Sequence, residues 1–189
     1  MMPELSLHIL DIVQNSQTAG ARNLAIDVCE STIKDRIIIT ISDDGRGMDD
    51  AERRAALNPF ATSRTSRRVG LGLPLFAQTC AMCNGALFIE SAPGKGTTVR
   101  AEMSRRHIDR PPFGNLADTL YLLFLTYTDI EISYRQTFNK LQFAIDTIAI
   151  KKILSTNCLD ATKHGKQLKH AILDGFTRLR SADESATKL

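Results

Sequence analysis

The sequence predicts an α+β fold in which helices cover one face of a mixed sheet. Three observations support this expectation. Segments with helical periodicity recur along the chain, strand-like segments come in consecutive pairs, and helical segments separate one pair from the next. Consecutive strands form hairpins, whereas a doubly wound parallel sheet requires a helix after each strand.

The first elements are a helix and a hairpin. Apolar residues recur at helical spacing from Leu5 to Ala19, and Gly20 then offers the left-handed conformation that ends many helices. Residues 23–29 and 36–42 are rich in β-branched side chains and are separated by a polar connector. They are expected to be two paired strands.

Two helices and a second hairpin follow. Residues 49–57 open with acidic residues and continue with strong helix formers, which predicts a short helix. After a polar loop at 58–69, helical periodicity returns at 71–83. Residues 86–91 and 97–103 have the pattern of strands joined by a glycine-rich turn.

A boundary is expected at residues 105–112, where charged residues precede two consecutive prolines in a stiff linker. It separates a domain at 1–104 from a small α+β extension at 113–156 and from a tail at 157–189 that is either helical or disordered. The expected elements beyond the linker are a helix at 116–125, paired strands at 129–134 and 141–145, helices at 148–154 and 165–180, and a disordered polar end at 181–189.

Composition and charge exclude several classes of protein. The net charge of +3 is small and no long basic run occurs, so nucleic acid is not an expected partner. No apolar stretch approaches the roughly 20 residues that cross a bilayer, and the N-terminus lacks the pattern of a signal peptide. Four scattered cysteines in a chain that needs no disulfides fit a reducing compartment. We therefore expect a cytoplasmic protein without a membrane partner, and a homodimer is left open.

Six of the eleven glycines form three Gly-x-Gly pairs, at 45/47, 70/72 and 94/96, each at a predicted junction between elements. Glycine is needed where the backbone takes a positive φ or where a ligand approaches closely. One such pair would be ordinary in a hairpin. Three pairs in order, with Asp43 before the first and a helix after the second, indicate a nucleotide pocket.

These motifs resemble those of the Bergerat-fold (GHKL) ATPase superfamily, which comprises gyrase-type topoisomerases, Hsp90 chaperones, histidine kinases and MutL-type repair proteins. The likeness covers residues 4–104 and is carried by LSLHILDIVQNSQTAGA, DDGRG, NPFATSRTSRRVGLGLPL and GKGT. Within the superfamily, the chain is most similar to stand-alone histidine-kinase-like ATP-binding proteins and anti-sigma-factor kinases. The resemblance implies a Bergerat-type α/β sandwich that binds ATP and Mg²⁺.

The resemblance also implies roles for single residues. Asp43 would accept a hydrogen bond from the adenine amino group and so select this base. Asn15 would bind Mg²⁺, and Asp11, one helical turn earlier, would be the general base. Taken alone, Asp43 would be an ordinary turn residue and Asn15 an ordinary buried amide. Other residues expected to contact the nucleotide are Gly45, Gly47, Met48 and Thr97.

The phosphates are expected at the start of the helix that follows the second glycine pair. Backbone amides and the positive end of the helix dipole would face them there. The loop at 58–69 would be a lid that supplies arginines to the phosphates, although a solvated basic loop is the alternative for each arginine. The residues expected in this phosphate site are Gly70, Leu71, Gly72, Leu73 and Arg64, with Arg67 and Arg68 nearby.

Three departures from the family pattern bear on catalysis. Family members that hydrolyse ATP commonly have Glu at the position of Asp11, so the shorter side chain leaves hydrolysis open. The lid usually has Gly two positions before Gly70, where this chain has Arg68. The few residues before Asp11 leave no room for the helical hairpin that carries the phosphoacceptor histidine of sensor kinases.

Two functions therefore compete. The first is a kinase that phosphorylates Ser, Thr or His on a separate protein, and it is preferred because the adenine and phosphate motifs are complete. The second is a non-catalytic ATP-dependent switch whose lid changes a surface offered to a regulatory partner. A ligase-like or mismatch-repair-like ATPase clamp ranks last, because too few residues follow the pocket for a transducer domain.

Three further residues have less specific patterns. His8 lies one turn before Asp11 and is expected to pack between helices, not to accept a phosphoryl group. Cys80 and Cys83 lie in a predicted amphipathic helix without a second Cys-x-x-Cys, so buried apolar positions are favoured over a metal or redox site.

Overall fold

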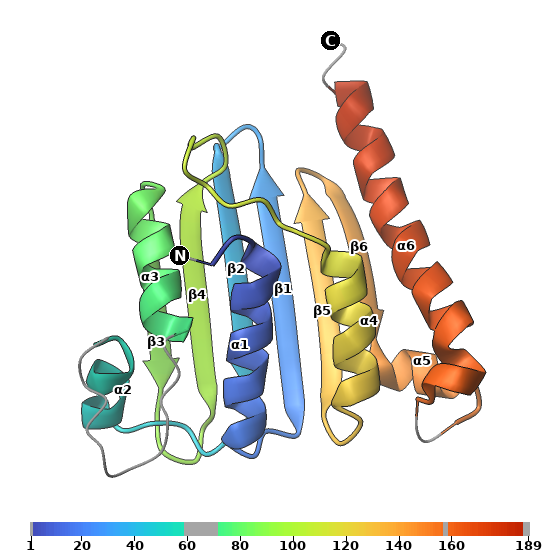
Figure 1. Cartoon of the computed structure of the whole chain (residues 1–189), viewed down its shortest axis with the longest axis horizontal. Coiled ribbons are helices and arrows are strands. Elements are labelled where there is room, and N and C mark those ends of the chain that lie inside the picture. The colour runs from blue at the N-terminus through green and yellow to red at the C-terminus, as the bar shows by residue number, and fades with distance from the viewer. Residues whose placement is uncertain (1, 59–71, 157–158, 187–189) are drawn as a thin grey trace.

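The computed structural model describes residues 2–58, 72–156 and 159–186. Helices and pairs of strands follow one another along these residues in the predicted order (Figure 1). The elements are α1 (Leu5–Thr18), β1 (Asn23–Ser31), β2 (Arg36–Asp43), α2 (Asp50–Ala56), α3 (Gly72–Met82), β3 (Ala86–Ser91), β4 (Thr97–Ser104), α4 (Leu116–Thr126), β5 (Glu131–Phe138), β6 (Leu141–Asp146), α5 (Thr147–Ile153) and α6 (Ala161–Ala186).

The strands form one mixed sheet with the order β3-β4-β2-β1-β5-β6 (Figure 1). The two predicted hairpins, β1–β2 and β3–β4, are both antiparallel, and β2 pairs with β4 to join them. β5 lies parallel to β1 along the whole of its length, and β6 returns antiparallel at the edge. The predicted α+β fold with a mixed sheet is confirmed.

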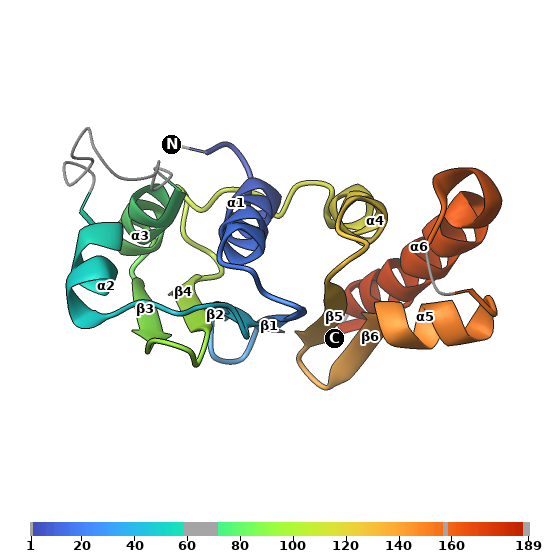
Figure 2. The same cartoon turned by 90° about the horizontal axis from the view of Figure 1, so that it is seen from below.

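Helices α1, α3 and α4 lie side by side on one face of the sheet (Figure 2). This face is apolar because alternate residues of β1, β2, β4 and β5 are buried under the helices, whereas Asp27, Thr40 and Arg100 face the other way. Within the described residues, no helix is long and apolar enough to span a membrane. The buried residues of β1 and β2 are Leu24, Ile26, Val28, Ile37, Ile39 and Ile41.

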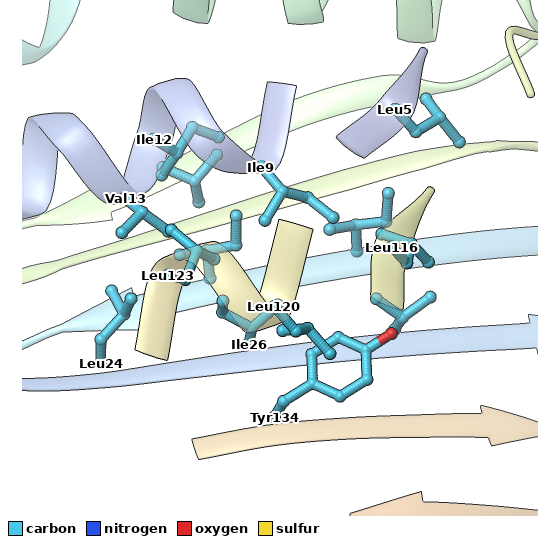
Figure 3. Packing of buried hydrophobic residues seen from close by; sticks show 14 of the residues in the cluster. Leu5, Ile9, Ile12, Val13, Leu24, Ile26, Leu116, Leu120, Leu123 and Tyr134 are labelled. Carbon is cyan, nitrogen blue, oxygen red and sulfur yellow. The ribbon is translucent and has the colours of Figure 1, made fainter. Parts of the chain in front are cut away.

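The two parts of the chain share one core, because α1 and α4 pack together over β1 and β5 (Figure 3). Ile9 and Leu120 extend from these helices towards Ile26 and Tyr134 of the strands, and each of the four is 1% exposed. Full burial of one such aliphatic side chain stabilises a fold by about 1.5–3 kcal/mol. The core therefore depends on residues before and after the linker.

The segment at 105–113 runs back to the N-terminal end of α1. The amide of Leu5 donates to the Pro112 carbonyl (2.9 Å), and the next amide donates to the Phe113 carbonyl (3.0 Å). These bonds satisfy amides that have no partner within the first turn of a helix. A division into domains at residue 104 stays a prediction, and the sheet runs through both parts.

Two elements differ from their predicted bounds. β5 continues past the expected end at 134 because it pairs with β1 as far as Phe138. α6 covers Ala161–Ala186, so the expected disordered end is wrong for residues 181–186. Apolar side chains at helical spacing hold α6 against α4 and β6. They are Leu168, Ile172, Phe176 and Leu179.

Candidate functional site

Asp43 ends β2 at the base of the expected nucleotide pocket. Its carboxylate accepts hydrogen bonds from the Ser16 hydroxyl (2.7 Å) and from the Gly45 amide (2.9 Å). Ser16 belongs to α1 and is 2% exposed, so the carboxylate is held between the first helix and the strand end. A carboxylate has about four lone-pair sites, so one held by two donors can still accept a bond from the adenine amino group.

The first and third glycine pairs let two loops approach each other closely. Gly47 and Gly96 have φ values of +66° and +78°. A Cβ on Gly96 would lie 1.9 Å from the Asp43 carbonyl oxygen, and a Cβ on Gly47 would lie 2.0 Å from the Ala92 carbonyl oxygen. Only glycine satisfies both the backbone conformation and the contact. The loop after β2 and the loop before β4 are therefore locked together.

Ser91 connects the same two loops. Its hydroxyl accepts a hydrogen bond from the Met48 amide (2.8 Å) and donates to the Gly96 carbonyl (2.9 Å). The Thr97 hydroxyl oxygen lies 2.9 Å away. Met48 and Thr97, both expected near the nucleotide, thus meet at a serine that was not among the predicted site residues. Its position at the end of a strand is shared by many ordinary serines and offers little signal.

Asp11 and Asn15 lie one turn apart on α1 and face the first residue of α3. The Asn15 side-chain amide donates to Asp11 Oδ2 over 3.4 Å. A Cβ on Gly72 would lie 1.5 Å from the same oxygen, so only glycine lets α3 begin beside Asp11. The structure thus brings together the predicted metal ligand, the predicted base and one end of the predicted phosphate site.

Burial raises the pKa of Asp11 above its ordinary value, and the hydrogen bond from Asn15 opposes this shift. A carboxylate with a raised pKa is a stronger proton acceptor. The pocket therefore increases the basicity of the residue at the general-base position, although its side chain is short.

Asn15 has a suitable atom for Mg²⁺. Because its amide nitrogen points at Asp11, its amide oxygen stays available, and oxygen is the ligand that Mg²⁺ prefers. In the part of the chain that the structure describes, no three His, Cys, Asp or Glu side chains form a metal-binding group. An ion at Asn15 would thus take its other ligands from phosphate oxygens and water.

The phosphate site is described only in part. Gly72 and Leu73 are buried at the N-terminal end of α3, where a helix favours negative charge. The predicted residues that lie outside the described ones, within 59–71, are Arg64, Arg67, Arg68, Gly70 and Leu71.

Asp44 ties the end of β2 to the start of β1. Its carboxylate accepts hydrogen bonds from the Asn23 amide (2.8 Å), the Asn23 side chain (2.7 Å) and the Arg22 amide (2.7 Å). These bonds, those from Asn23 first, hold the pKa of Asp44 below its ordinary value. Asp44 therefore holds the start of β1 beside the turn that follows β2.

His8 is buried between α1 and α3, as expected. Its ring stacks on Phe76 with 4.4 Å between centroids, and its Nε2 lies 3.2 Å from the Thr79 hydroxyl. Because that hydroxyl donates to the Leu75 carbonyl, it accepts from His8 Nε2, and Nδ1 has no partner among the described residues. Burial lowers the pKa of His8 to about 4, so the ring is neutral at neutral pH.

Stability in mild acid is expected to depend on His8. The unfolded chain binds a proton at this residue below pH 6.5, whereas the folded ring stays neutral down to about pH 4. Between pH 6.5 and about pH 4 the unfolded state thus binds more protons than the folded state. The free energy of unfolding therefore falls as the pH drops through this window, by about 3 kcal/mol in total. Urea denaturation should show that His8→Phe loses less unfolding free energy than the wild type as the pH is lowered, because this variant keeps the stacked ring without a titratable nitrogen. Equal losses for both proteins would contradict this expectation.

Cys80 and Cys83 are buried in the packing of α3, and both are 0% exposed. Burial raises the pKa of the Cys80 thiol to about 12 and also raises the pKa of Cys83. Neutral thiols are poor nucleophiles and poor metal ligands. The structure therefore agrees with apolar roles for this pair.

Two curated proteins resemble about half of this chain. A "Non-motile and phage-resistance protein" of Caulobacter vibrioides is 31% identical over 97 residues, which cover 49% of this chain and 12% of that protein. A protein of Shewanella frigidimarina that is named as a candidate sensor protein is 31% identical over 94 residues, covering 49% and 14%. The chain thus matches only a small part of the length of these relatives.

A solved structure, the MutL ATPase domain of Aquifex aeolicus complexed with ADP, has a similar fold. It has a TM-score of 0.50 and 10% identity, and the likeness covers 82% of this chain and 70% of that one. Residues 3–107, more than half of the chain, match the family model for histidine kinase-, DNA gyrase B- and HSP90-like ATPases. The match includes the interlocked loops, Asp43 and the Asp11–Asn15 pair. The chain therefore belongs to the family of histidine kinase-, DNA gyrase B- and HSP90-like ATPases.

Proposed function

We propose that this chain binds ATP and Mg²⁺ between α1 and the start of α3 and transfers the γ-phosphoryl group to a separate cytoplasmic protein. An ATPase domain of this family supports ATP binding, and the transfer is the added step. One observation carries the proposal. Asp11 touches the first residue of α3 with Asn15 beside it, so the proposed general base, the proposed metal ligand and the N-terminal end of a helix lie next to one another.

Asp43 would select adenine as the nucleobase. The carboxylate is oriented by Ser16 and Gly45, and it would accept the hydrogen bond of the adenine amino group. The loop at Gly47 and Met48 and the loop at Gly96 would lie against the base and sugar. Their interlocking would keep this part of the pocket formed before ATP arrives, which lowers the entropic cost of binding.

In the proposed reaction, a hydroxyl oxygen or an imidazole nitrogen of the partner attacks the γ-phosphorus. The new bond to phosphorus forms as the bond to the β-phosphate oxygen breaks, and ADP leaves with the electron pair. Asp11 would accept the proton of an attacking hydroxyl. Asn15 would hold Mg²⁺, which would supply positive charge that offsets the charge of the phosphates. The amides at the start of α3 would donate to phosphate oxygens.

A non-catalytic ATP-dependent switch is the second candidate. It is favoured by the short side chain of Asp11, whose Oδ2 already accepts from Asn15 and lies against Gly72. A carboxylate held in this way would have less freedom to reach an attacking group. A switch would bind ATP, change the surface offered to a partner and release the nucleotide unchanged.

Label transfer from γ-labelled ATP to a partner in a cell lysate is expected to require Asp11. Asp11→Asn keeps the size of the side chain and removes the proton acceptor, so labelling of a Ser or Thr partner should fall by about 100-fold or more while ATP still binds. Asn15→Ala should reduce both labelling and the Mg²⁺ dependence of ATP affinity. Autoradiography measures the first quantity and calorimetry the second.

Gln14→Ala is the matched control, because Gln14 is exposed on the same turn of α1 and should leave both measurements at the wild-type level. Tight ATP binding with neither label transfer nor hydrolysis would contradict the kinase and favour the switch. Labelling of a hydroxyl group that survives Asp11→Asn would contradict the assignment of the base.

A further inference from the structure

A cavity of about 560 Å³ lies between the start of α4, the end of β5 and the C-terminal half of α6. Its volume falls within the roughly 300–1,000 Å³ that is typical of small-molecule sites. Along β1, Glu30 at the cavity is about 20 Å from Leu24, the strand partner of Asp43. The cavity is therefore separate from the nucleotide pocket.

Aromatic and aliphatic side chains form about half of the cavity wall. Phe138 of β5 and Phe176 of α6 are 6% and 8% exposed, and Leu116 of α4 is 5% exposed. Phe113 and Leu179 also line the cavity. Walls of this kind bind the apolar body of a ligand, and flat rings in particular.

Gln136 is a polar residue of the cavity wall. The residue is 8% exposed, and its Oε1 accepts a hydrogen bond from the Tyr134 hydroxyl (2.8 Å). Among the residues that the structure describes, none accepts a hydrogen bond from its Nε2. This donor is open to the cavity, so it can pair with a ligand that carries a hydrogen-bond acceptor.

Two carboxylates, those of Glu4 and Glu30, line the cavity. Glu30 is paired with Arg105, so its charge is compensated. The Glu4 carboxylate accepts a hydrogen bond from the Ser6 hydroxyl (3.1 Å) and lies against Gly114, where a Cβ would be 2.0 Å from Glu4 Oε2. No basic side chain within residues 2–58, 72–156 and 159–186 pairs with Glu4. Among the lining residues the unpaired charge is therefore negative, and the guanidinium groups of Arg105 and Arg110 lie beside two lining rings, 5.8 Å from the centres of Phe138 and Phe113.

We propose that this cavity is a second ligand site, which binds a small aromatic amine that carries a hydrogen-bond acceptor. The ring packs between Phe138 and Phe176, the acceptor meets the Nε2 of Gln136, and the ammonium group faces Glu4. Each of these groups is held by contacts within the chain, so the site is formed before the ligand binds. A carboxylate in place of the ammonium group would be repelled by Glu4.

The probe for this site is 5-hydroxytryptamine, whose indole fluorescence can be followed directly because the chain contains no tryptophan. Fluorescence anisotropy should show saturable binding to the full chain. Affinity should be about tenfold lower for 5-hydroxyindole-3-acetate, which replaces the ammonium by a carboxylate, and also lower for tryptamine, which lacks the hydroxyl group. Glu4→Gln should weaken the binding of the amine and reduce the preference for amine over acid.

Two variants on α6 form the structural test. Thr177 is exposed at the cavity edge, and Thr177→Phe should fill the cavity and abolish binding. Gln167→Phe makes the same addition at an exposed position outside the cavity and should bind as the wild type does. Circular dichroism establishes that both variants are folded. Absence of saturable amine binding to the wild type, equal affinities for amine and acid, or unchanged binding to Thr177→Phe would each overturn the proposal.

Discussion

Asp43→Asn is expected to lower the affinity for ATP by about 100-fold while the chain stays folded. An Asn oxygen can still accept from the Gly45 amide, and the Ser16 hydroxyl can donate to the Ile12 carbonyl, 3.1 Å away, and accept from the new amide nitrogen. The local structure therefore survives. The charged acceptor for adenine is lost, and a hydrogen bond to a charged group contributes about 1.5–3 kcal/mol.

Calorimetric titration with ATP measures this loss, and Asp44→Asn is the matched control. Asp44 carries the same side chain at the next position, but its carboxylate is used by the backbone and side chain at the start of β1. Its replacement should reduce stability and leave ATP affinity near the wild-type value. If Asp43→Asn bound ATP as tightly as Asp44→Asn does, the assignment of the adenine site would be wrong.

Gly96→Ala is expected to destabilise the fold by about 3 kcal/mol or more and to remove ATP binding. The added Cβ would lie 1.9 Å from the Asp43 carbonyl oxygen and 2.9 Å from the Asp44 Cα, and backbone atoms cannot move aside as a flexible side chain can. The positive φ of +78° adds conformational strain. Relief of the contact would move the end of β2 and with it the adenine-binding carboxylate.

Gly94→Ala separates the effect of conformational strain from the effect of the steric contact with Asp43. Gly94 lies in the same turn and has a similar φ of +73°, but nothing lies within 4 Å of the position that its Cβ would take. Only conformational strain remains, so the expected loss is about 1–2 kcal/mol with ATP binding retained. Urea denaturation and ATP titration of both variants test the difference. Equal losses of stability would show that strain, and not close packing against Asp43, explains the glycine at position 96.

Local sequence patterns predict most elements of this fold. Alternation in β1 and β2 and helical spacing in α1 record which side chains face a core, so these elements are found within a residue or two of their predicted bounds. The glycines at 47 and 96 are predictable for a related reason, because few other residues adopt their backbone conformation. The helical end of α6 is missed because its last residues are polar.

Residues that act across the fold could not be predicted in this way. Ser16 holds Asp43 across 27 positions of the chain, and Ser91 holds the Met48 amide across 43 positions. Ser91 belongs to no motif, and Ser16 lies within the first one without any local pattern that sets it apart. Their roles follow from the docking of α1 on the end of β2 and from the contact between two loops.

By itself, the sequence determined the order of the elements, the apolar face of each, and the glycine and carboxylate motifs of an ATP pocket, because all of these depend on neighbouring residues. The tertiary structure alone decided that β5 pairs in parallel with β1, that Asp11 meets Gly72, and that Glu4, Gln136 and Phe176 surround one cavity. These contacts join residues far apart in the chain. Their formation depends on how whole faces pack together, which no local periodicity records.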